Sequence, residues 1–169
     1  MTVLDIKRVN EIIKGINRLM NNLIEQMKIV LADSFVMYTK AHGYHWNVEG
    51  KSFPMLHEFF GDIYAEIYGS IDDTAEQIRQ IQGRAIHTLI EFDKYRTVPD
   101  QAITVATDSS GMLMDLFAAN QLVLASLMRA YEESDALNED GLSNYLQDRM
   151  MAHKKHGWML RSTLNKAGE

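Results

Sequence analysis

The sequence contains no cysteine among its 169 residues. Disulfides, zinc–thiolate sites, iron–sulfur clusters and thiol nucleophiles are therefore excluded. Proline is almost as scarce, since only Pro54 and Pro99 occur, and alternating runs of β-branched residues are also missing. Few positions therefore interrupt a helix, and no segment has the alternation that predicts a strand. These absences predict an all-α protein.

Long basic runs and uninterrupted apolar runs are missing as well. The formal net charge is −6 at pH 7, so the molecule as a whole repels nucleic acid and anionic membranes and favours cations. The most apolar stretch, residues 112–128, is interrupted by Asp115, Asn120 and Gln121, which argues against a membrane span. The first residues, MTVLDIKRVNEI, are too polar for a secretory signal. We therefore expect a cytoplasmic protein with no membrane partner.

Length and composition predict one folded domain over residues 1–169. Hydrophobic residues make up 46% of the chain and charged residues 24%, which is ordinary for a globular protein with a sizeable core. Apolar residues recur at helical spacing in four long segments. The segments that we expect to be helices are residues 9–47, 52–83, 112–131 and 140–164.

The connections between these helices differ in length. In the first connection Gly50 breaks the helical pattern. Ser52 is then placed as the N-cap of the second helix, and Pro54 fits its first turn. Residues 84–110 form a connection that is too long for a tight turn and too apolar for a free linker, so we expect it to pack on the surface and to contain a short helix. Residues 132–140 are expected to form an acidic turn. Four long helices with one long crossover between the second and third describe a ferritin-like bundle.

Two histidines, His45 and His57, stand twelve positions apart in the stretch AHGYHWNVEGKSFPMLHEFF, at the junction of the first two helices. The Glu-x-x-His pairs that carry an ordinary ferritin-like di-iron site occur nowhere in the sequence. The second helix instead carries Asp72 and Glu76, an i, i+4 pair on one face. Any metal site must therefore combine these residues in another way.

Helix geometry constrains that combination. His57 and Asp72 lie within about 60° on the helical wheel but about 22 Å apart along the axis, so they cannot hold the same ion in one chain. Two copies of the helix packed antiparallel about a two-fold axis would bring His57 of one copy against Asp72 and Glu76 of the other. The metal site is therefore predicted between subunits.

Several quoted stretches together resemble one family. YHWNVEG, LHEFF, IDDTAEQI and AHKKHGWMLRSTL are similar to the Dps family, the DNA-binding proteins from starved cells, a branch of the ferritins, over nearly the whole chain. The resemblance implies a homo-dodecamer, a hollow shell that protects against oxidative stress by oxidising Fe(II). It also implies hydrogen peroxide as the preferred oxidant over oxygen, and storage of the ferric product as mineral.

The resemblance also implies the ferroxidase centre, which the family carries at two-fold dimer interfaces. Its pattern is a His before Trp, a second His twelve positions on, and an Asp and a Glu on the same helix. These ligands fall on His45, His57, Asp72 and Glu76, with Trp46 as an electron donor or a packing residue. Two imidazoles and two carboxylates suit Fe(II), favour Fe(III) once it forms and tolerate Zn or Mn. Two iron ions per site are expected.

One position departs from the family pattern. Family members commonly carry another Asp four residues after the second His, but Gly61 stands there and Asp62 follows it. Asp62 projects about 100° away around the helix, so it can serve the second iron only if the backbone adjusts. The glycine suggests either a close approach of backbones or simple sequence drift.

An acidic cluster, Asp135, Glu139 and Asp140, surrounds the start of the last helix. It is either a solvated charged turn or, as in the resembled family, the lining of a three-fold pore that guides iron inward through its negative potential. The remaining histidines are expected to cap or pack, and the eleven methionines to fill the core. These histidines are His42, His87, His153 and His156.

Two other functions remain open at this point. A DNA-compacting stress protein is one, but family members that coat DNA use a Lys/Arg-rich tail, and only Lys7 and Arg8 are basic before the first predicted helix. We therefore expect no DNA binding. A structural cage with a decayed metal site is the other, and Gly61 is the feature that favours it.

Overall fold

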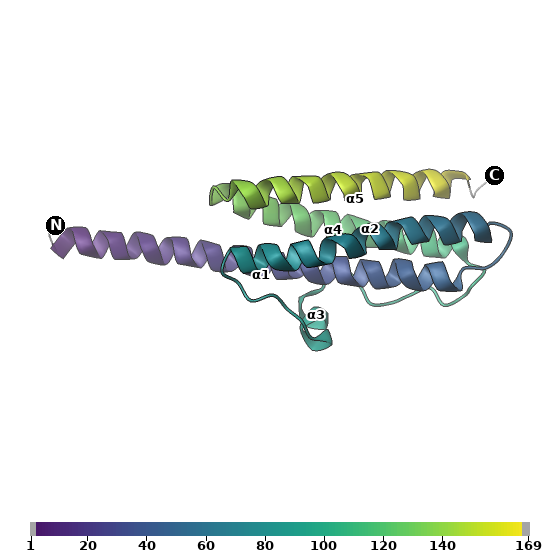
Figure 1. Ribbon diagram of the computed structural model, residues 1–169, viewed down its shortest axis with the longest axis horizontal. Helices are drawn as coiled ribbons and strands as arrows, with labels where there is room; N and C mark the ends of the chain where they lie inside the picture. Colours follow the sequence, from purple (N-terminus) through teal and green to yellow (C-terminus); the bar gives the residue numbers. More distant parts are fainter. Residues whose placement is uncertain (1–2, 167–169) are drawn as a thin grey trace.

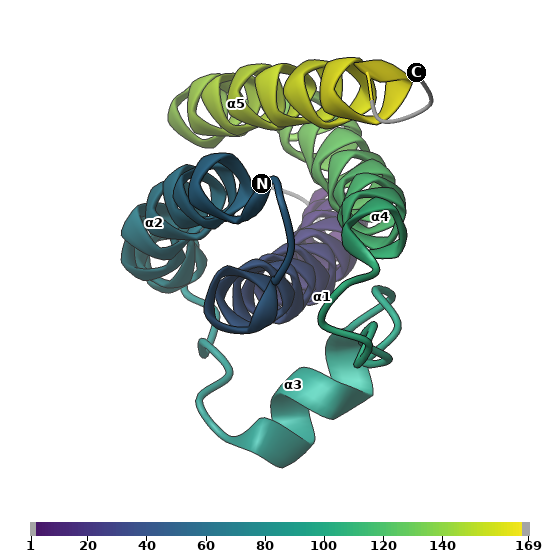
Figure 2. The same ribbon diagram turned by 90° about the vertical axis from the view of Figure 1, so that its right-hand side faces the viewer.

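The computed structural model describes the backbone of residues 3–166 and the side chains of residues 6–164. Its helices are α1 (Val3–Asn47), α2 (Phe53–Gln80), α3 (Leu89–Tyr95), α4 (Ser109–Ala136) and α5 (Asp140–Lys166). The four long helices lie side by side as a bundle, and the short α3 lies outside it beside α1 (Figure 1, Figure 2). Between residues 3 and 166 no strand is formed. The predicted all-α, ferritin-like fold is therefore confirmed, including the short helix in the crossover.

The bundle is held together by the apolar faces of its helices. α1 packs against α2 and α4, and α4 packs against α5. The largest fully buried side chains are Phe60, Leu23, Met27, Leu31, Met37, Leu56, Ile63, Ile67, Ile78, Met112, Leu113 and Leu116. Burial of one such side chain stabilises a fold by about 1.5–3 kcal/mol. Burial of these side chains therefore stabilises the packing of α1 on α2 and α4.

The first part of α1 projects beyond the bundle. This helix has 45 residues, and its N-terminal part extends well past the ends of the other long helices (Figure 1). The helix begins at Val3, whereas the sequence predicted a start at residue 9. The apolar pattern used for that prediction does continue toward the N-terminus, as described below.

The crossover from α2 to α4 is fixed to α1 by buried polar contacts. Asp33 is fully buried, and its carboxylate accepts hydrogen bonds from Thr97 N at 2.5 Å and Val98 N at 2.9 Å. Farther along α1, Lys40 Nζ donates to the Gln101 carbonyl oxygen in the crossover and also lies 2.9 Å from the Asp115 carboxylate of α4. A buried carboxylate is stable only when donors surround it, so these contacts hold the long connection on the bundle surface as the sequence predicted.

The predicted start of α2 is confirmed, whereas that of α4 needs correction. Ser52 is the N-cap residue of α2, but its side chain makes no capping hydrogen bond. α4 begins at Ser109 rather than at residue 112, because the Asp108 carboxylate accepts a hydrogen bond from Gly111 N at 2.9 Å and caps the helix there. Capping by aspartate satisfies one of the amides that the first helical turn leaves free.

The predicted acidic turn is shorter than expected. α4 continues to Ala136, so residues 132–136 are helical and only residues 137–139 connect it to α5. The buried hydroxyls of Ser134 and Ser143 lie 2.8 Å apart and join the two helices at this point. Asn138 reverses the chain with a left-handed φ of 57°, a conformation that asparagine tolerates better than most residues.

α4 is the one helix in residues 3–166 that is long and apolar enough to cross a membrane. Its buried residues include Leu113, Leu116 and Val123, which belong to the bundle core. A buried core helix reaches this composition for packing reasons alone.

Candidate metal centre

His45 and His57 face each other across the turn between α1 and α2. His45 lies in the last turn of α1 and His57 in the second turn of α2. The connecting turn is tight because Gly50 adopts a φ of 108°, a region open to glycine. The two imidazole rings stack with centroids 3.7 Å apart and an angle of 22° between their planes.

Each histidine is held by the backbone of the other. His45 Nδ1 lies 2.6 Å from the His57 carbonyl oxygen, and His57 Nδ1 lies 2.7 Å from the His45 carbonyl oxygen. A carbonyl can only accept, so each Nδ1 carries the proton and donates. In the neutral form of each ring, Nε2 is therefore unprotonated, which is the tautomer that metal-binding histidines use.

Gly61 gives His45 room to lie in this position. A Cβ atom at residue 61 would lie 3.3 Å from His45 Nδ1 and 3.4 Å from its Cε1. The imidazole therefore packs directly on the backbone of α2. The sequence left open a close approach of backbones or simple drift, but the group that lies against Gly61 is the His45 side chain.

Aromatic side chains pack beside the histidine pair. The centroid of the His42 ring lies 3.9 Å from that of the Trp46 ring. The His42 ring also stacks on the Tyr64 ring, with centroids 4.1 Å apart. Burial, and then the neighbouring charge of His45, lowers the pKa of His42. Trp46 remains 65% exposed. His42 thus packs, as expected, but it packs against the candidate centre.

The carboxylates are not brought to the histidines within one chain. Asp62, Asp72 and Glu76 are all exposed on α2. Among the described residues, no three His, Asp or Glu side chains form a group that could hold a metal. One chain therefore presents a pair of histidines and, separately, an exposed acidic face.

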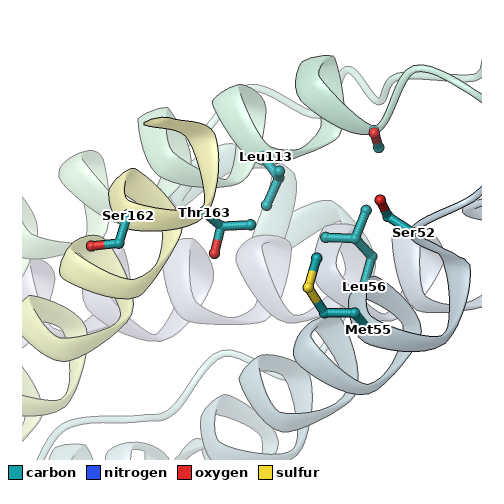
Figure 3. Close-up of a pocket in the computed structure, with 7 residues that line it drawn as sticks. Ser52, Met55, Leu56, Leu113, Ser162 and Thr163 are labelled. Atoms are coloured by element: carbon teal, nitrogen blue, oxygen red, sulfur yellow. The ribbon is translucent and has the colours of Figure 1, made fainter. Parts of the chain in front are cut away.

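The hollow at the same end of the bundle does not offer an alternative site. It has a volume of about 270 Å³, and Ser52, Leu56, Leu113 and Thr163 are among its lining residues (Figure 3). The lining consists of aliphatic groups and hydroxyls without a titratable partner. Hydrolytic or acid–base chemistry requires such a partner, so this hollow is not a candidate catalytic site and the histidine pair remains the candidate centre.

Known proteins share this architecture and much of the sequence. The ferritin-like domain family matches residues 24–168. The DNA protection during starvation protein 2 of Bacillus anthracis is 31% identical over 143 residues, which cover 85% of this chain and 97% of that protein. The DNA protection during starvation protein of Brevibacillus brevis is 32% identical over 153 residues, covering 86% and 99%. This chain belongs to the Dps family of ferritin-like proteins.

A solved Dps structure agrees with this assignment. The DPS protein of Vibrio cholerae, described as a member of a broad superfamily of ferritin-like diiron-carboxylate proteins, matches with a TM-score of 0.82. It is 26% identical, and the match covers 87% of this chain and 91% of that chain. The Dps fold therefore extends over most of the four-helix bundle.

The acidic cluster of this Dps chain lies at the opposite end of the bundle from the histidine pair (Figure 1). Asp135 is exposed in the last turn of α4, Asp140 is exposed as the first residue of α5, and Glu139 is half-buried between them. The acidic cluster thus surrounds the chain reversal between α4 and α5.

Two of the remaining histidines are buried in the Dps bundle, as expected of packing residues. His153 Nδ1 lies 2.8 Å from the Asn120 side-chain oxygen, and burial holds the pKa of His153 well below its usual value. His156 lies 3.5 Å from the Glu66 carboxylate. Burial raises the pKa of Glu66, but its two hydrogen bonds to Arg149 outweigh this and lower it.

The packing of Tyr64 beside the histidine pair and the contact of the His45 side chain with Gly61 were not predicted from the sequence. Tyr64 follows His57 by seven residues, which places both on one face of α2, and this spacing could have linked them. The contact of Gly61 with His45 joins two helices, so spacing within one helix could not reveal it.

Proposed function

We propose that this protein is a mini-ferritin that stores and detoxifies iron by oxidising Fe(II) at centres shared between two subunits. The Dps fold supports the iron-storage role, because the Vibrio cholerae relative is described as a diiron-carboxylate protein. The observation that carries the proposal is the mutual anchoring of His45 and His57 through Nδ1. It prepares two imidazoles for metal binding without any contribution from a third side chain.

The two rings are held close together before any metal binds. Their centroids lie 3.7 Å apart, and each ring is fixed by its Nδ1 hydrogen bond to the other residue's carbonyl oxygen. The pair is therefore positioned before iron arrives, and little conformational freedom has to be lost on binding.

The carboxylates of the centre come from the two-fold partner in this proposal. Asp72 and Glu76 are exposed and lie too far along α2 from His57 to reach the same ion. An antiparallel pair of α2 helices brings Asp72 and Glu76 of the partner subunit against His45 and His57. The completed set of two nitrogens and two carboxylates suits Fe(II), favours Fe(III) after oxidation, and accepts Zn or Mn.

Hydrogen peroxide is the oxidant that we propose, with oxygen as the slower alternative. Two Fe(II) ions each release one electron, the O–O bond of one peroxide breaks, and two protons complete two water molecules. Asp62 is the candidate ligand for the second iron. Where only one iron is bound, Trp46 is the candidate donor of the second electron, and a further Fe(II) later reduces the indole radical.

Storage requires an enclosed space and a route into it. We propose a shell of twelve subunits in the cytoplasm, in which Asp135, Glu139 and Asp140 line pores. Three carboxylates in one turn create a negative potential that concentrates Fe(II) locally. The ferric product then accumulates inside as mineral.

Stopped-flow mixing of Fe(II)-loaded protein with peroxide or with oxygen tests this function. We expect oxidation above the buffer rate with both oxidants and a faster reaction with peroxide. A variant that lacks His45 and His57 should fall to the buffer rate, while His87→Ala, which alters an exposed histidine outside the centre, should not. Wild-type protein at the buffer rate would favour a structural cage instead.

DNA protection is named for the Bacillus anthracis relative and is the competing function. The chain carries a net charge of −6, which opposes counterion release from phosphate. We expect unchanged plasmid migration at about 0.15 M salt. Retarded migration would support DNA compaction.

A further inference from the structure

α1 carries one continuous apolar stripe, and only part of it is covered. The stripe repeats at alternating intervals of three and four residues. Its members are Ile6, Val9, Ile13, Ile16, Met20, Leu23, Met27, Val30, Ser34, Met37, Ala41 and Tyr44. This is the a and d pattern of a heptad repeat, which places all of them along one side of a helix.

Burial along the stripe changes where α1 leaves the bundle. From Leu23 to Tyr44 its members are at most 4% exposed. Before Met20 the exposures rise to 43% for Ile6, 48% for Val9 and Ile13, and 50% for Ile16. The apolar stripe, which packs on α2 and α4 inside the bundle, therefore continues along α1 into solvent. This stripe is the seam through which another helix could pack.

No other part of residues 3–166 can cover the exposed segment, residues 6–19, which we call the α1 extension. α2 ends at Gln80 and α5 begins at Asp140, and a hollow lined by Asn17, Met20, Gln80 and Glu139 marks the level where these elements stop. Figure 1 shows the α1 extension alone beyond that level. The family match begins only at residue 24, so it does not include the extension.

The flanks of the seam favour a second copy of the same helix. The positions beside the a and d residues are neutral, with Asn10 and Asn17 on one side and Ile12 and Leu19 on the other. The charged residues of the extension all lie on the outward positions of the repeat. They are Lys7, Arg8, Glu11, Lys14 and Arg18. Identical helices can therefore approach without like charges meeting at the seam.

The identity of the seam residues sets the number of helices. Ile occupies both kinds of seam position, a at Ile6 and Ile13 and d at Ile16. β-branched residues at both positions favour three or more strands over two, and the additional apolar residues Ile12 and Leu19 widen the seam accordingly. Burying an exposed apolar face is favourable in water, so such an assembly would stabilise the extension.

We propose that the α1 extensions of three copies of this chain associate as a parallel three-helix coiled coil through the seam formed by Ile6, Val9, Ile13, Ile16 and Met20. The extensions then join subunits at a point outside the ferritin-like bundle. This interaction does not depend on the iron chemistry, so either proposal can fail while the other stands.

Single-cysteine variants of the full chain test this association, because the natural sequence has no cysteine. Ile13→Cys places a thiol in the middle of the seam, and Lys14→Cys places one on the outward face as the matched control. Both positions lie outside the bundle core, so unchanged circular dichroism and thermal unfolding verify the fold. Each variant is treated with a three-armed maleimide and separated under denaturing conditions.

We expect Ile13→Cys to yield mainly a product of three chains and Lys14→Cys to remain mainly a single chain. Products of two chains at most, or equal yields for the two variants, would overturn the three-helix seam. An anionic membrane is the competing occupant, since the outward face is basic. Absence of cross-linking, together with protection of the Ile13→Cys thiol from alkylation by phosphatidylserine vesicles alone, would overturn the proposal in favour of a lipid surface.

Discussion

His45 and His57 position one another: Nδ1 of each ring donates to the main-chain carbonyl of the other residue, at 2.6 Å and 2.7 Å. Neither ring orientation is therefore set by its own helix alone. In many metal sites a separate carbonyl or carboxylate orients each histidine. Here the two candidate ligands supply that support to each other, and the loss of one should disturb the other.

Alanine substitution of the pair should therefore be strongly non-additive. His45→Ala or His57→Ala should each slow peroxide-dependent Fe(II) oxidation by more than about tenfold. The double variant should be little slower than either single variant. Removing one histidine already disturbs the other, so removing both costs little further oxidation rate. Stopped-flow rates with His87→Ala as the control measure this. Losses that multiply in the double variant would show that the two histidines act independently.

Position 61 separates the effect of crowding from that of a carboxylate. Gly61→Ala adds a Cβ at 3.3 Å from His45 Nδ1, so the imidazole must shift by a few tenths of an ångström. We expect slower oxidation by a few-fold in this variant. Gly61→Asp adds the same Cβ together with a candidate ligand for the second iron.

The comparison of the two variants is the informative measurement. Gly61→Asp should oxidise Fe(II) faster than Gly61→Ala and should bind iron more tightly in titrations. If both variants are slowed equally, a carboxylate at position 61 does not reach the second iron. If Gly61→Ala equals the wild type, the contact with His45 does not limit the reaction.

Burial of neutral His153 predicts a pH dependence of stability. Its folded pKa lies well below the ordinary value of 6.5, so below pH 6.5 the unfolded chain binds a proton that the folded chain does not. Above pH 6.5 His153 is neutral in both states and does not change the free energy of unfolding with pH. Below it, the free energy of unfolding falls by about 1.4 kcal/mol per pH unit from this residue until the folded pKa is reached.

Thermal unfolding of wild type and His153→Asn between pH 7.5 and pH 5.5 measures this contribution. The asparagine can still donate to Asn120 but cannot titrate. The midpoint of wild type should fall more steeply with acid than that of the variant. His156 contributes in the same direction, since burial lowers its pKa too, so the variant keeps part of the slope. Parallel curves would assign the acid sensitivity to other groups.

The sequence predicted the elements better than their ends. Helical periodicity is a property of many residues, so it identified four long helices. The length and apolar content of the crossover predicted its short helix. Single contacts decided the ends. Asp108 starts α4 three residues early by binding Gly111 N, and the paired hydroxyls of Ser134 and Ser143 extend it into the acidic segment.

The candidate site shows the same limit. The twelve-residue spacing of His45 and His57 and the resemblance to Dps identified the pair. Their exchange of Nδ1 hydrogen bonds and the contact of Gly61 with His45 arise from the packing of α1 on α2, which no spacing within one helix contains. Asp72 and Glu76 remain a proposal, because their role depends on a second subunit.

The central claim is that His45 and His57 act with the carboxylates of another subunit, and mixed shells test it most directly. One variant lacks both histidines and another lacks both Asp72 and Glu76, so each pure shell is inactive. Equal amounts are dissociated and reassembled together. With random pairing about half of the two-fold interfaces are mixed, and one of the two sites in each has all four ligands.

Iron oxidation in these shells should therefore return to about a quarter of the wild-type rate. Mass spectrometry of the intact assemblies verifies that the two variants have mixed. If all four ligands belonged to one chain, every site would stay incomplete in every mixture. Mixed shells without any recovered oxidation would contradict the shared centre.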